Sequence, residues 1–335
     1  HLNVIDHDGR LWLVDISIPP ALTRDIKTEL AEASEMRTLM PPRPFGSHKG
    51  TFGHLVVVAG SEGKTGAAAM TAEAGLRSGA GLVTTAVPAS LNDLLEVKLT
   101  EAMTLPLPEA AASRALGQEA LNPLKDFLTD KTAVALGPGL GTHPETQELV
   151  RALVRDCPLP MVIDADGANA LAGQLEVIKS AKGPRILTPH PGEMGRLLGV
   201  SSQEIQSRRL EVARNFAAAH GVWVILKGAQ TVVAEPDGHL SLNPTGNPVL
   251  ASGGTGDVLT GLIGGFLAQG LSPRDAARLG VYLHGLAADY LEEVIGPRGH
   301  IAGDLPTWLP ELLTEFSQGR FPAIEEEICL RLVTS

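Results

Sequence analysis

Short apolar runs alternate with helical stretches along most of the chain. From His54 onward, the apolar runs are continuous, which is typical of strands buried on both faces of a sheet. These strand-like segments cover residues 54–60, 81–88, 133–141, 160–169, 185–193 and 222–228. Helical stretches at 65–78, 144–155 and 203–220 lie between them. The alternation predicts an α/β fold with a central, mostly parallel sheet and helices on both faces.

The pattern changes after Gly228. Residues 231–243 read as a β-hairpin with Asp237-Gly238 at its tip. A glycine-rich segment, 246–257, then opens an apolar helix that we expect to run to about Gln269. Two more helices are expected at about 273–292 and 305–316.

Polar or glycine-rich segments follow five of the predicted strands. They are residues 60–61, 137–141, 164–169, 190–193 and 227–228. In parallel α/β sheets, ligands bind beyond the carboxyl ends of the strands. The sequence therefore predicts one binding site at that edge of the sheet.

Composition excludes several classes of protein. The formal net charge is −11 and no Lys/Arg-rich run occurs, which argues against general nucleic-acid binding. The most apolar stretch, 258–267, is too short to span a bilayer, and residues 1–9 do not have the order of a secretory signal. The two cysteines, Cys157 and Cys329, are expected to be free thiols. We expect a cytoplasmic protein with no membrane or nucleic-acid partner.

The strongest local motif is GGTGD, residues 253–257, at a predicted helix start. Glycines such as Gly254 and Gly256 let a ligand approach the backbone, and N–H groups at a helix start attract phosphate. Asp257 would lie in the first helical turn, stay ionised and accept a hydroxyl proton during phosphoryl transfer. The alternative is an ordinary glycine turn with a capping aspartate.

Three weaker motifs follow predicted strands. In TPHPGE, His190 could contact substrate and Glu193 could act on Mg²⁺, or both could belong to a helix cap. In DADGAN, Asp164, Asp166 and Asn169 suit magnesium or substrate hydroxyls, and equally suit turns and caps. In KGAQT, residues 227–231, a lysine could hold phosphate or simply be solvated. His284 is expected to be a structural histidine.

Two glycine-rich segments resemble nucleotide-binding motifs but do not match their spacing. Residues 60–66 end like a Walker A loop, but Val58 stands where that loop needs its first glycine. The glycines of 137–141 have the spacing GxGxG, with Thr142 where a dinucleotide-binding fingerprint has its last glycine.

Together, the motifs strongly resemble the ADP/ATP-dependent NAD(P)H-hydrate dehydratases of the ribokinase-like superfamily. The resemblance covers roughly residues 45–316. It is carried by seven segments in order: HKGTFGHLVVVAGSEGKTGA, LRSGAGLVTTAVP, GPGLG, VIDADGAN, LTPHPGEM, LKGAQT and NPVLASGGTGDVLTG. It implies that the S-epimer of hydrated NADH or NADPH is dehydrated with ADP or ATP as phosphoryl donor and Mg²⁺ as cofactor. Phosphorylation would turn the hydroxyl into a good leaving group.

The resemblance also implies a role for each matched residue. Asp257 would be the catalytic base, and Gly254 and Gly256 part of the anion hole. The substrate-binding residues would be Ala67, Gly139, Gly141, His190 and Asp257. The nucleotide-binding residues would be Lys227, Gly228, Ala229, Gln230, Thr231 and Gly256. Glu193 would be associated with magnesium, although His190 stands where many sugar kinases have Asn.

The N-terminal segment resembles the end of another domain. LWLVDISIP, residues 11–19, resembles the closing strand of the hydrate epimerase that is often fused in front of this dehydratase, with Ser17 where Gly is usual. We therefore expect residues 1–40 to be an epimerase remnant and linker without epimerase activity, 41–318 the dehydratase domain, and 319–335 a tail. The chain would then be a fragment of a bifunctional enzyme.

Two alternatives remain open. A small-molecule kinase of the same superfamily, for hydroxymethylpyrimidine or a sugar, would share Asp257 and its anion hole. A nucleotide-binding protein without catalysis is the other alternative. By resemblance, the chain is expected to form a homo-oligomer, with a tetramer as in related bacterial enzymes.

Overall fold

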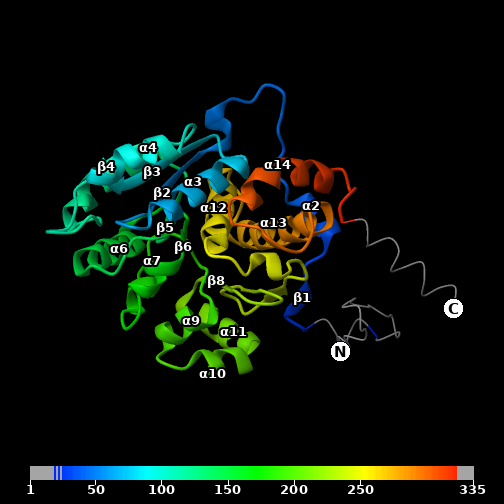
Figure 1. Ribbon diagram of the computed structural model, residues 1–335. Coiled ribbons are helices and arrows are strands. Elements are labelled where there is room, and N and C mark those ends of the chain that lie inside the picture. The colour runs from blue at the N-terminus through cyan, green and yellow to red at the C-terminus, as the bar shows by residue number, and fades with distance from the viewer. Residues whose placement is uncertain (1–18, 20–21, 23–24, 323–335) are drawn as a thin grey trace.

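A ten-stranded sheet crosses the part of the molecule that this computed structural model describes, residues 19, 22 and 25–322 (Figure 1). The strand order is β1-β10-β9-β8-β7-β6-β5-β2-β3-β4. Neighbouring strands are parallel except that β9 runs antiparallel to both β8 and β10. The expected mostly parallel sheet is confirmed. The strands are β1 (Thr28–Leu30), β2 (His54–Val58), β3 (Leu82–Pro88), β4 (Met103–Leu107), β5 (Ala133–Leu136), β6 (Met161–Ile163), β7 (Arg185–Leu187), β8 (Trp223–Leu226), β9 (Val232–Ala234) and β10 (Leu240–Leu242).

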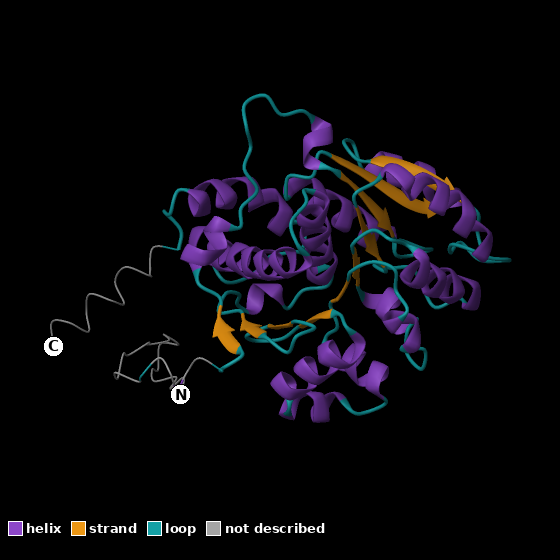
Figure 2. Cartoon of the chain, turned by 180° about the vertical axis from the view of Figure 1, so that it is seen from behind, coloured by secondary structure: helices purple, strands orange, loops and turns teal. Residues whose placement is uncertain are grey.

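Helices cover both faces of the sheet, as the view from behind shows (Figure 2). Successive residues of β2 point to opposite faces, because side chains alternate along a strand. Leu55 and Val57 join the core under α12 and α13, whereas Val56 and Val58 join the core under α6. The helices are α2 (Ala33–Thr38), α3 (Thr65–Arg77), α4 (Asn92–Lys98), α5 (Leu121–Phe127), α6 (Pro144–Asp156), α7 (Ala165–Asn169), α8 (Glu176–Lys179), α9 (Pro191–Leu198), α10 (Ser202–Ser207), α11 (Arg209–His220), α12 (Thr255–Ala268), α13 (Pro273–Val294) and α14 (Asp304–Ser317).

Several expected elements differ from the observed ones. The single helix expected at 203–220 is wrong, because Arg208, at φ −136° and ψ 34°, separates α10 from α11. The strands expected at 160–169 and 185–193 are much shorter, because α7 begins after one further residue that follows β6 and α9 begins after three further residues that follow β7. Strand β4 was not predicted. It lies at the edge of the sheet and contains Pro106, which is tolerated there because an edge strand need not donate every N–H.

The opposite edge of the sheet is formed by β1, which pairs in parallel with β10. This strand precedes residue 40, where the sequence placed the boundary of the main domain, yet it belongs to the same sheet. The strand expected at 11–18 lies outside the described residues, as do residues 323–335. The domain boundaries and the epimerase remnant therefore stay predictions.

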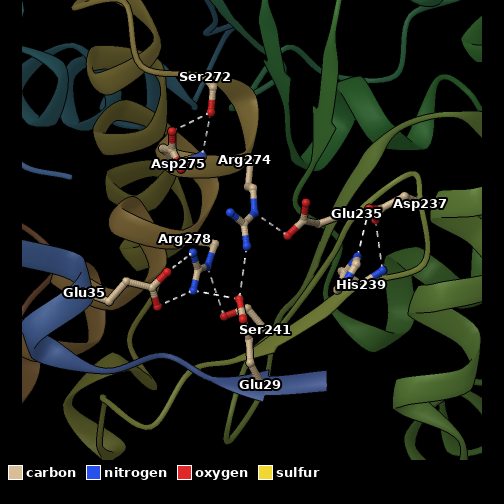
Figure 3. A network of polar contacts seen from close by, with 10 residues as sticks. All are labelled: Glu29, Glu35, Glu235, Asp237, His239, Ser241, Ser272, Arg274, Asp275 and Arg278. Carbon is tan, nitrogen blue, oxygen red and sulfur yellow. Dashed lines mark hydrogen bonds and ion pairs between the residues drawn. The ribbon is translucent and has the colours of Figure 1, made fainter. Parts of the chain in front are cut away.

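A buried arginine connects this N-terminal segment to α13 (Figure 3). The side chain of Arg278 has no exposed surface and donates to both carboxylate oxygens of Glu35, each at 2.7 Å. A second carboxylate, that of Glu29, lies 2.8 Å away. One turn earlier on the helix, Arg274 donates to Glu235 at 2.8 Å. The ion pairs thus bind β1 and α2 to the hairpin and to α13.

Across residues 25–322, none of the helices has both the length and the apolar character that crossing a membrane requires. Cys157 is a free thiol, buried as a core residue, as expected. Cys329 lies outside the described residues.

Candidate active site

Three loops that are distant in sequence meet at the carboxyl ends of the central strands. The Lys227 ammonium, just after β8, lies 2.8 Å from the Asp164 carboxylate, just after β6. The Glu193 carboxylate, in the first turn of α9, lies 3.7 Å from the same ammonium. These residues come from three of the five loops predicted to project at this edge. The structure therefore brings them together as the sequence indicated.

The start of α12 lies against this ion pair. Gly254 has φ +98°, a conformation that favours glycine, and it turns the chain into the helix. A methyl group in place of the Gly256 hydrogen would lie 3.4 Å from Lys227 Nζ and 3.7 Å from Asp164 Oδ2. Within residues 25–322, the N–H groups of Gly254, Gly256 and Asp257 have no hydrogen-bond acceptor. Free amides at a helix start suit an anion.

The Asp257 carboxyl is the most strongly perturbed acid beside these amides. Burial raises its pKa to about 7, and the nearby carboxylates of Asp164, Asp166 and Glu193 add to the effect against the opposing charge of Lys227. Asp257 was expected to stay ionised, but a pKa of about 7 means that part of the carboxyl group is protonated near neutral pH. A carboxyl group with a pKa near neutral pH is well matched to general-base catalysis.

Lys227 is fixed by the carboxylates around it. Burial disfavours its charge, but Asp164 and Glu193 outweigh burial, so its pKa is raised. The ammonium is therefore a permanent positive charge under the helix start. The interpretation of a solvated lysine is wrong, since only 20% of the side chain is exposed.

Asp164 does not cap α7, although it occupies the N-cap position of that helix. Instead, its buried carboxylate accepts hydrogen bonds from Thr188 at 2.7 Å and from Thr260 at 3.0 Å, besides that from Lys227. Three donors therefore hold one carboxylate in place. Neither threonine was predicted from the sequence to belong to the site. Thr260 was detectable as a polar residue within the apolar run of α12.

A second cluster contains the residues expected to contact substrate. Asp166 accepts hydrogen bonds from the Lys64 ammonium at 2.9 Å and from the Gly141 N–H at 2.8 Å. A methyl group at Gly139 would lie 3.1 Å from the Cβ of Ala67 and 2.9 Å from the carbonyl oxygen of Lys64. The loop after β5 therefore packs directly on the start of α3. The structure brings Ala67, Gly139 and Gly141 together.

His190 and Glu193 form a capping box at the start of α9. His190 Nδ1 accepts from the N–H groups of Gly192 and Glu193, and Glu193 Oε2 accepts from the His190 N–H at 2.8 Å. Pro191 occupies the first turn, where its missing N–H costs nothing. The capping alternative is thus confirmed. About half of the His190 side chain stays exposed, so the ring is also accessible to a ligand.

A cavity of about 520 Å³ opens beside Lys227 and Gly256. All the residues expected to bind nucleotide line it: Lys227, Gly228, Ala229, Gln230, Thr231 and Gly256. The cavity is also lined by residues that were not predicted from the sequence to bind nucleotide: Asn243, Thr245, Gly246, Asn247, Pro248, Leu250, Ala251, Thr255, Leu259, Val281, His284 and Gly285. Arg209 holds the nucleotide loop by donating to the carbonyls of Ala229 and Gln230.

The charge of the site fits a magnesium–nucleotide complex. The carboxylates of Asp164, Asp166 and Glu193 all raise the pKa of Asp257, which indicates an excess of negative charge that a cation would relieve. The described residues include no group of three or more His, Cys, Asp or Glu side chains that could hold a metal ion. Mg²⁺ commonly binds through phosphates, waters and one or two carboxylates, so a cage made only of protein is not required.

The fold places the chain in a known structural class. It is similar to a ribokinase-like superfamily protein from Enterococcus faecalis V583, with a TM-score of 0.75 and 26% identity over 87% of this chain and 97% of that one. Hydroxyethylthiazole kinase from Pyrococcus horikoshii OT3, at 19% identity and a TM-score of 0.51, shares the fold alone. The ribokinase-like α/β class is thus confirmed.

Within that class, the NAD(P)H-hydrate dehydratase model matches residues 55–309, and the chain belongs to this family. The ADP-dependent (S)-NAD(P)H-hydrate dehydratase of Bacillus subtilis is 38% identical over 84% of this chain and 96% of its own length. The crystal structure of the Bacillus subtilis ADP/ATP-dependent enzyme, co-crystallised with ATP/Mg²⁺, has a TM-score of 0.74 and 35% identity over 86% of this chain and 98% of that one.

Longer relatives also match. The bifunctional NAD(P)H-hydrate repair enzyme of Moorella thermoacetica is 46% identical over 92% of this chain. The chain spans 59% of the length of that relative. For this chain, a domain fused in front of the dehydratase stays a prediction, as does the tetramer.

Proposed function

We propose that the chain dehydrates the S-epimer of hydrated NADH or NADPH, with ADP or ATP as phosphoryl donor. The observation that carries the proposal is the start of α12, where amides without an acceptor lie next to the Asp257 carboxyl and above the Lys227 ammonium. Amides and ammonium together favour the negative charge of a phosphoryl group in transfer. The carboxyl group supplies the base.

In the first step, Asp257 accepts the proton of the substrate hydroxyl as its oxygen attacks the terminal phosphorus of the nucleotide. The bond from that phosphorus to the rest of the nucleotide breaks. The leaving group is AMP when ADP is the donor, and ADP when ATP is the donor. The amide N–H groups of Gly256 and Asp257 stabilise the charge that develops on the phosphoryl oxygens.

In the second step, the carbon–oxygen bond of the phosphorylated hydrate breaks. Phosphate departs with the bonding electrons, and loss of a proton from the neighbouring carbon restores the ring double bond. The sum is loss of water from the hydrate and hydrolysis of one phosphate bond. Transfer is needed because hydroxide is a much poorer leaving group than phosphate.

The remaining residues position the two ligands. The loop of Lys227 to Thr231 and the other residues that line the cavity would hold the nucleotide. The cluster of Ala67, Gly139 and Gly141, with His190 at its accessible edge, would hold the hydrated dinucleotide. Mg²⁺ would neutralise charge on the phosphates when bound, with Glu193 as the carboxylate placed to hold the ion or one of its waters.

The test is recovery of NADH absorbance from its hydrate in the presence of Mg²⁺ and either ADP or ATP. We expect recovery with at least one nucleotide, and a loss of about 10²–10⁴-fold in Asp257→Asn, because the base is removed. Asp93→Asn is a matched control, since Asp93 is an exposed aspartate in the first turn of α4.

Two results would contradict the proposal. Unchanged turnover in Asp257→Asn would remove the proposed base. Accumulation of a stable phosphorylated product without recovery of NADH would indicate a kinase reaction instead of dehydration.

A further inference from the structure

His284 lies in the middle of α13 and touches the start of α12. Its ring Nε2 is 2.8 Å from the Thr255 carbonyl oxygen, and only 8% of the residue is exposed. A carbonyl oxygen only accepts hydrogen bonds, so Nε2 must carry a proton. Burial lowers the pKa of His284 to about 4, so the ring is neutral near pH 7 and keeps its one proton on Nε2.

The Thr255 carbonyl belongs to the same peptide unit as the Gly256 N–H. This unit is planar and trans, so its C=O and N–H bonds point in opposite directions. Any group that fixes the carbonyl direction therefore fixes the direction of the Gly256 amide. A hydrogen bond on the carbonyl oxygen also polarises the peptide and makes its N–H a stronger donor.

Glycine on either side leaves this peptide with little restraint from its own side chains. Gly256 has no Cβ to restrict its backbone, and Gly254 precedes Thr255 at a positive φ of +98°. The Thr255 side chain is itself held, because its hydroxyl donates to the carbonyls of Leu250 and Ser252 at 2.9 and 3.1 Å. The carbonyl of the first residue of a helix accepts one hydrogen bond within the helix, and His284 adds a second one that further fixes its direction.

The rest of α13 supports the nucleotide cavity in a similar way. Thr245 Oγ1 donates to the Tyr282 carbonyl at 2.8 Å, and a methyl group at Gly285 would lie 2.2 Å from that hydroxyl oxygen. One turn further on, Asp289 accepts from the Gly246 N–H at 2.9 Å. The helix therefore holds the wall around residues 245–246 and, through His284, the start of α12.

We propose that His284 is a positioning residue for phosphoryl transfer, which aims the Gly256 amide at the transferred phosphoryl group through the Thr255 carbonyl. This inference rests on the proposed function. Because the charge on the phosphoryl oxygens grows in the transition state, a misdirected amide slows the chemical step more than it weakens nucleotide binding.

Two variants of His284 test this role. In His284→Leu the hydrogen-bond donor is lost, and we expect kcat to fall about 10- to 100-fold, which is somewhat less than the loss on removing a whole oxyanion donor. The KM for the nucleotide should change less than about threefold. In His284→Gln the amide nitrogen takes the place of Nε2, and most of kcat should return.

A control separates positioning from stability. Leu283→Ala removes a fully buried side chain of the same helix that takes no part in the hydrogen bond. It should lower the Tm while kcat per folded molecule stays at the wild-type value. A positioning role thus requires His284→Leu to lose kcat at temperatures where both variants are folded.

Other outcomes would overturn the inference. They are an unchanged kcat in His284→Leu, a rise in KM without loss of kcat, or a His284→Gln variant that is folded and as slow as His284→Leu. If the wild-type protein shows no dehydration, the proposed function fails by itself. The positioning role can then be read from binding of ADP or AMP with aluminium fluoride, a phosphoryl transition-state mimic, which His284→Leu should weaken at least tenfold.

Discussion

Lys227 Nζ lies 2.8 Å from Asp164 Oδ1 and joins the ends of β8 and β6 across the intervening β7. The Asp164 side chain is only 2% exposed. Gly256 lies against both groups, so this buried ion pair forms the base on which the start of α12 rests.

Removal of one partner of this pair should cost more stability than removal of both charges. In Lys227→Met the Asp164 carboxylate stays buried without a cation in contact, and we expect unfolding to become easier by about 3–5 kcal/mol. In Lys227→Met with Asp164→Asn, most of that loss should return, because the carboxylate in direct contact with the lysine is removed as well, and Glu193 keeps its hydrogen bond from the His190 N–H. Activity should stay low in both. Denaturant unfolding measures the difference, and equal stability of the single and double variants would refute this account.

The raised pKa of Asp257 predicts an effect of pH on stability. The folded-state pKa of about 7 lies above the ordinary value of 3.8, so the folded protein holds a proton that the unfolded chain has lost between these pH values. Stability therefore falls as the pH rises from 4 to 7. Asp257→Asn, which cannot ionise, should be more stable than wild type at high pH by roughly 2–4 kcal/mol, allowing for partial exposure.

Chemical unfolding at several pH values checks this prediction. The gain in Asp257→Asn should shrink toward zero near the ordinary pKa of the carboxyl group. In the wild type, kcat/KM should rise with pH through about 7, because the base must be ionised in the free enzyme. A gain in stability that is the same at all pH values would show that charge at Asp257 is not its cause.

Gly256→Ala should lower activity without lowering the stability of the fold. The added methyl group would meet nothing closer than Lys227 Nζ at 3.4 Å, which is an ordinary contact. Alanine also favours a helix over glycine by about 0.5–1 kcal/mol, so stability should hold or rise. The methyl group would, however, lie where the phosphoryl group approaches, and we expect kcat/KM to fall at least about 100-fold, as for loss of an oxyanion donor.

Gly303→Ala is the control for that variant. Gly303 stands at the N-cap of α14, with open space where its Cβ would be. It should keep wild-type activity. Near-normal activity in Gly256→Ala, measured by recovery of NADH, would mean that the phosphoryl group does not pass close to this backbone.

The ion pairs of Arg278 predict that replacing the arginine and replacing its two glutamate partners destabilise the protein by different amounts. In Arg278→Met, Glu35 loses its partner and Glu29 keeps only Arg274, at 3.4 Å, but 41% and 42% of the Glu29 and Glu35 side chains are exposed and water can solvate them. In Glu29→Gln with Glu35→Gln, a guanidinium without exposed surface loses both charged partners. We expect the double variant to lose about 3–5 kcal/mol and Arg278→Met clearly less. Thermal unfolding compares them, and a larger loss in Arg278→Met would contradict the argument.

Much of the central sheet could be predicted because buried parallel strands leave a strong signal in sequence. The apolar run at 54–60 became β2, and the tip at Asp237-Gly238 closed a hairpin between β9 and β10. Edge elements were missed for a physical reason. Strand β4 is partly exposed and contains Pro106, so it lacks the pattern of a buried strand.

The site could be predicted only where its loops contain a recognisable sequence motif. The motif GGTGD at 253–257 predicted a helix start suited to binding an anion, and α12 does begin within this motif, at Thr255. Its partners from other elements carry no such signal. His284 and Thr260 are single polar residues within helical runs, and their contacts with Thr255 and Asp164 depend on how those helices pack.

The sequence by itself determined the alternation of strands and helices and the glycine-rich turns, because burial pattern and backbone freedom are local properties of a segment. Only the tertiary structure decided which charges face one another. The pairing of Lys227 with Asp164, the resulting environment of Asp257 and the hydrogen bond from His284 to Thr255 all join segments far apart in the chain. Electrostatic and hydrogen-bond energies depend on distance and burial in space, which folding alone sets.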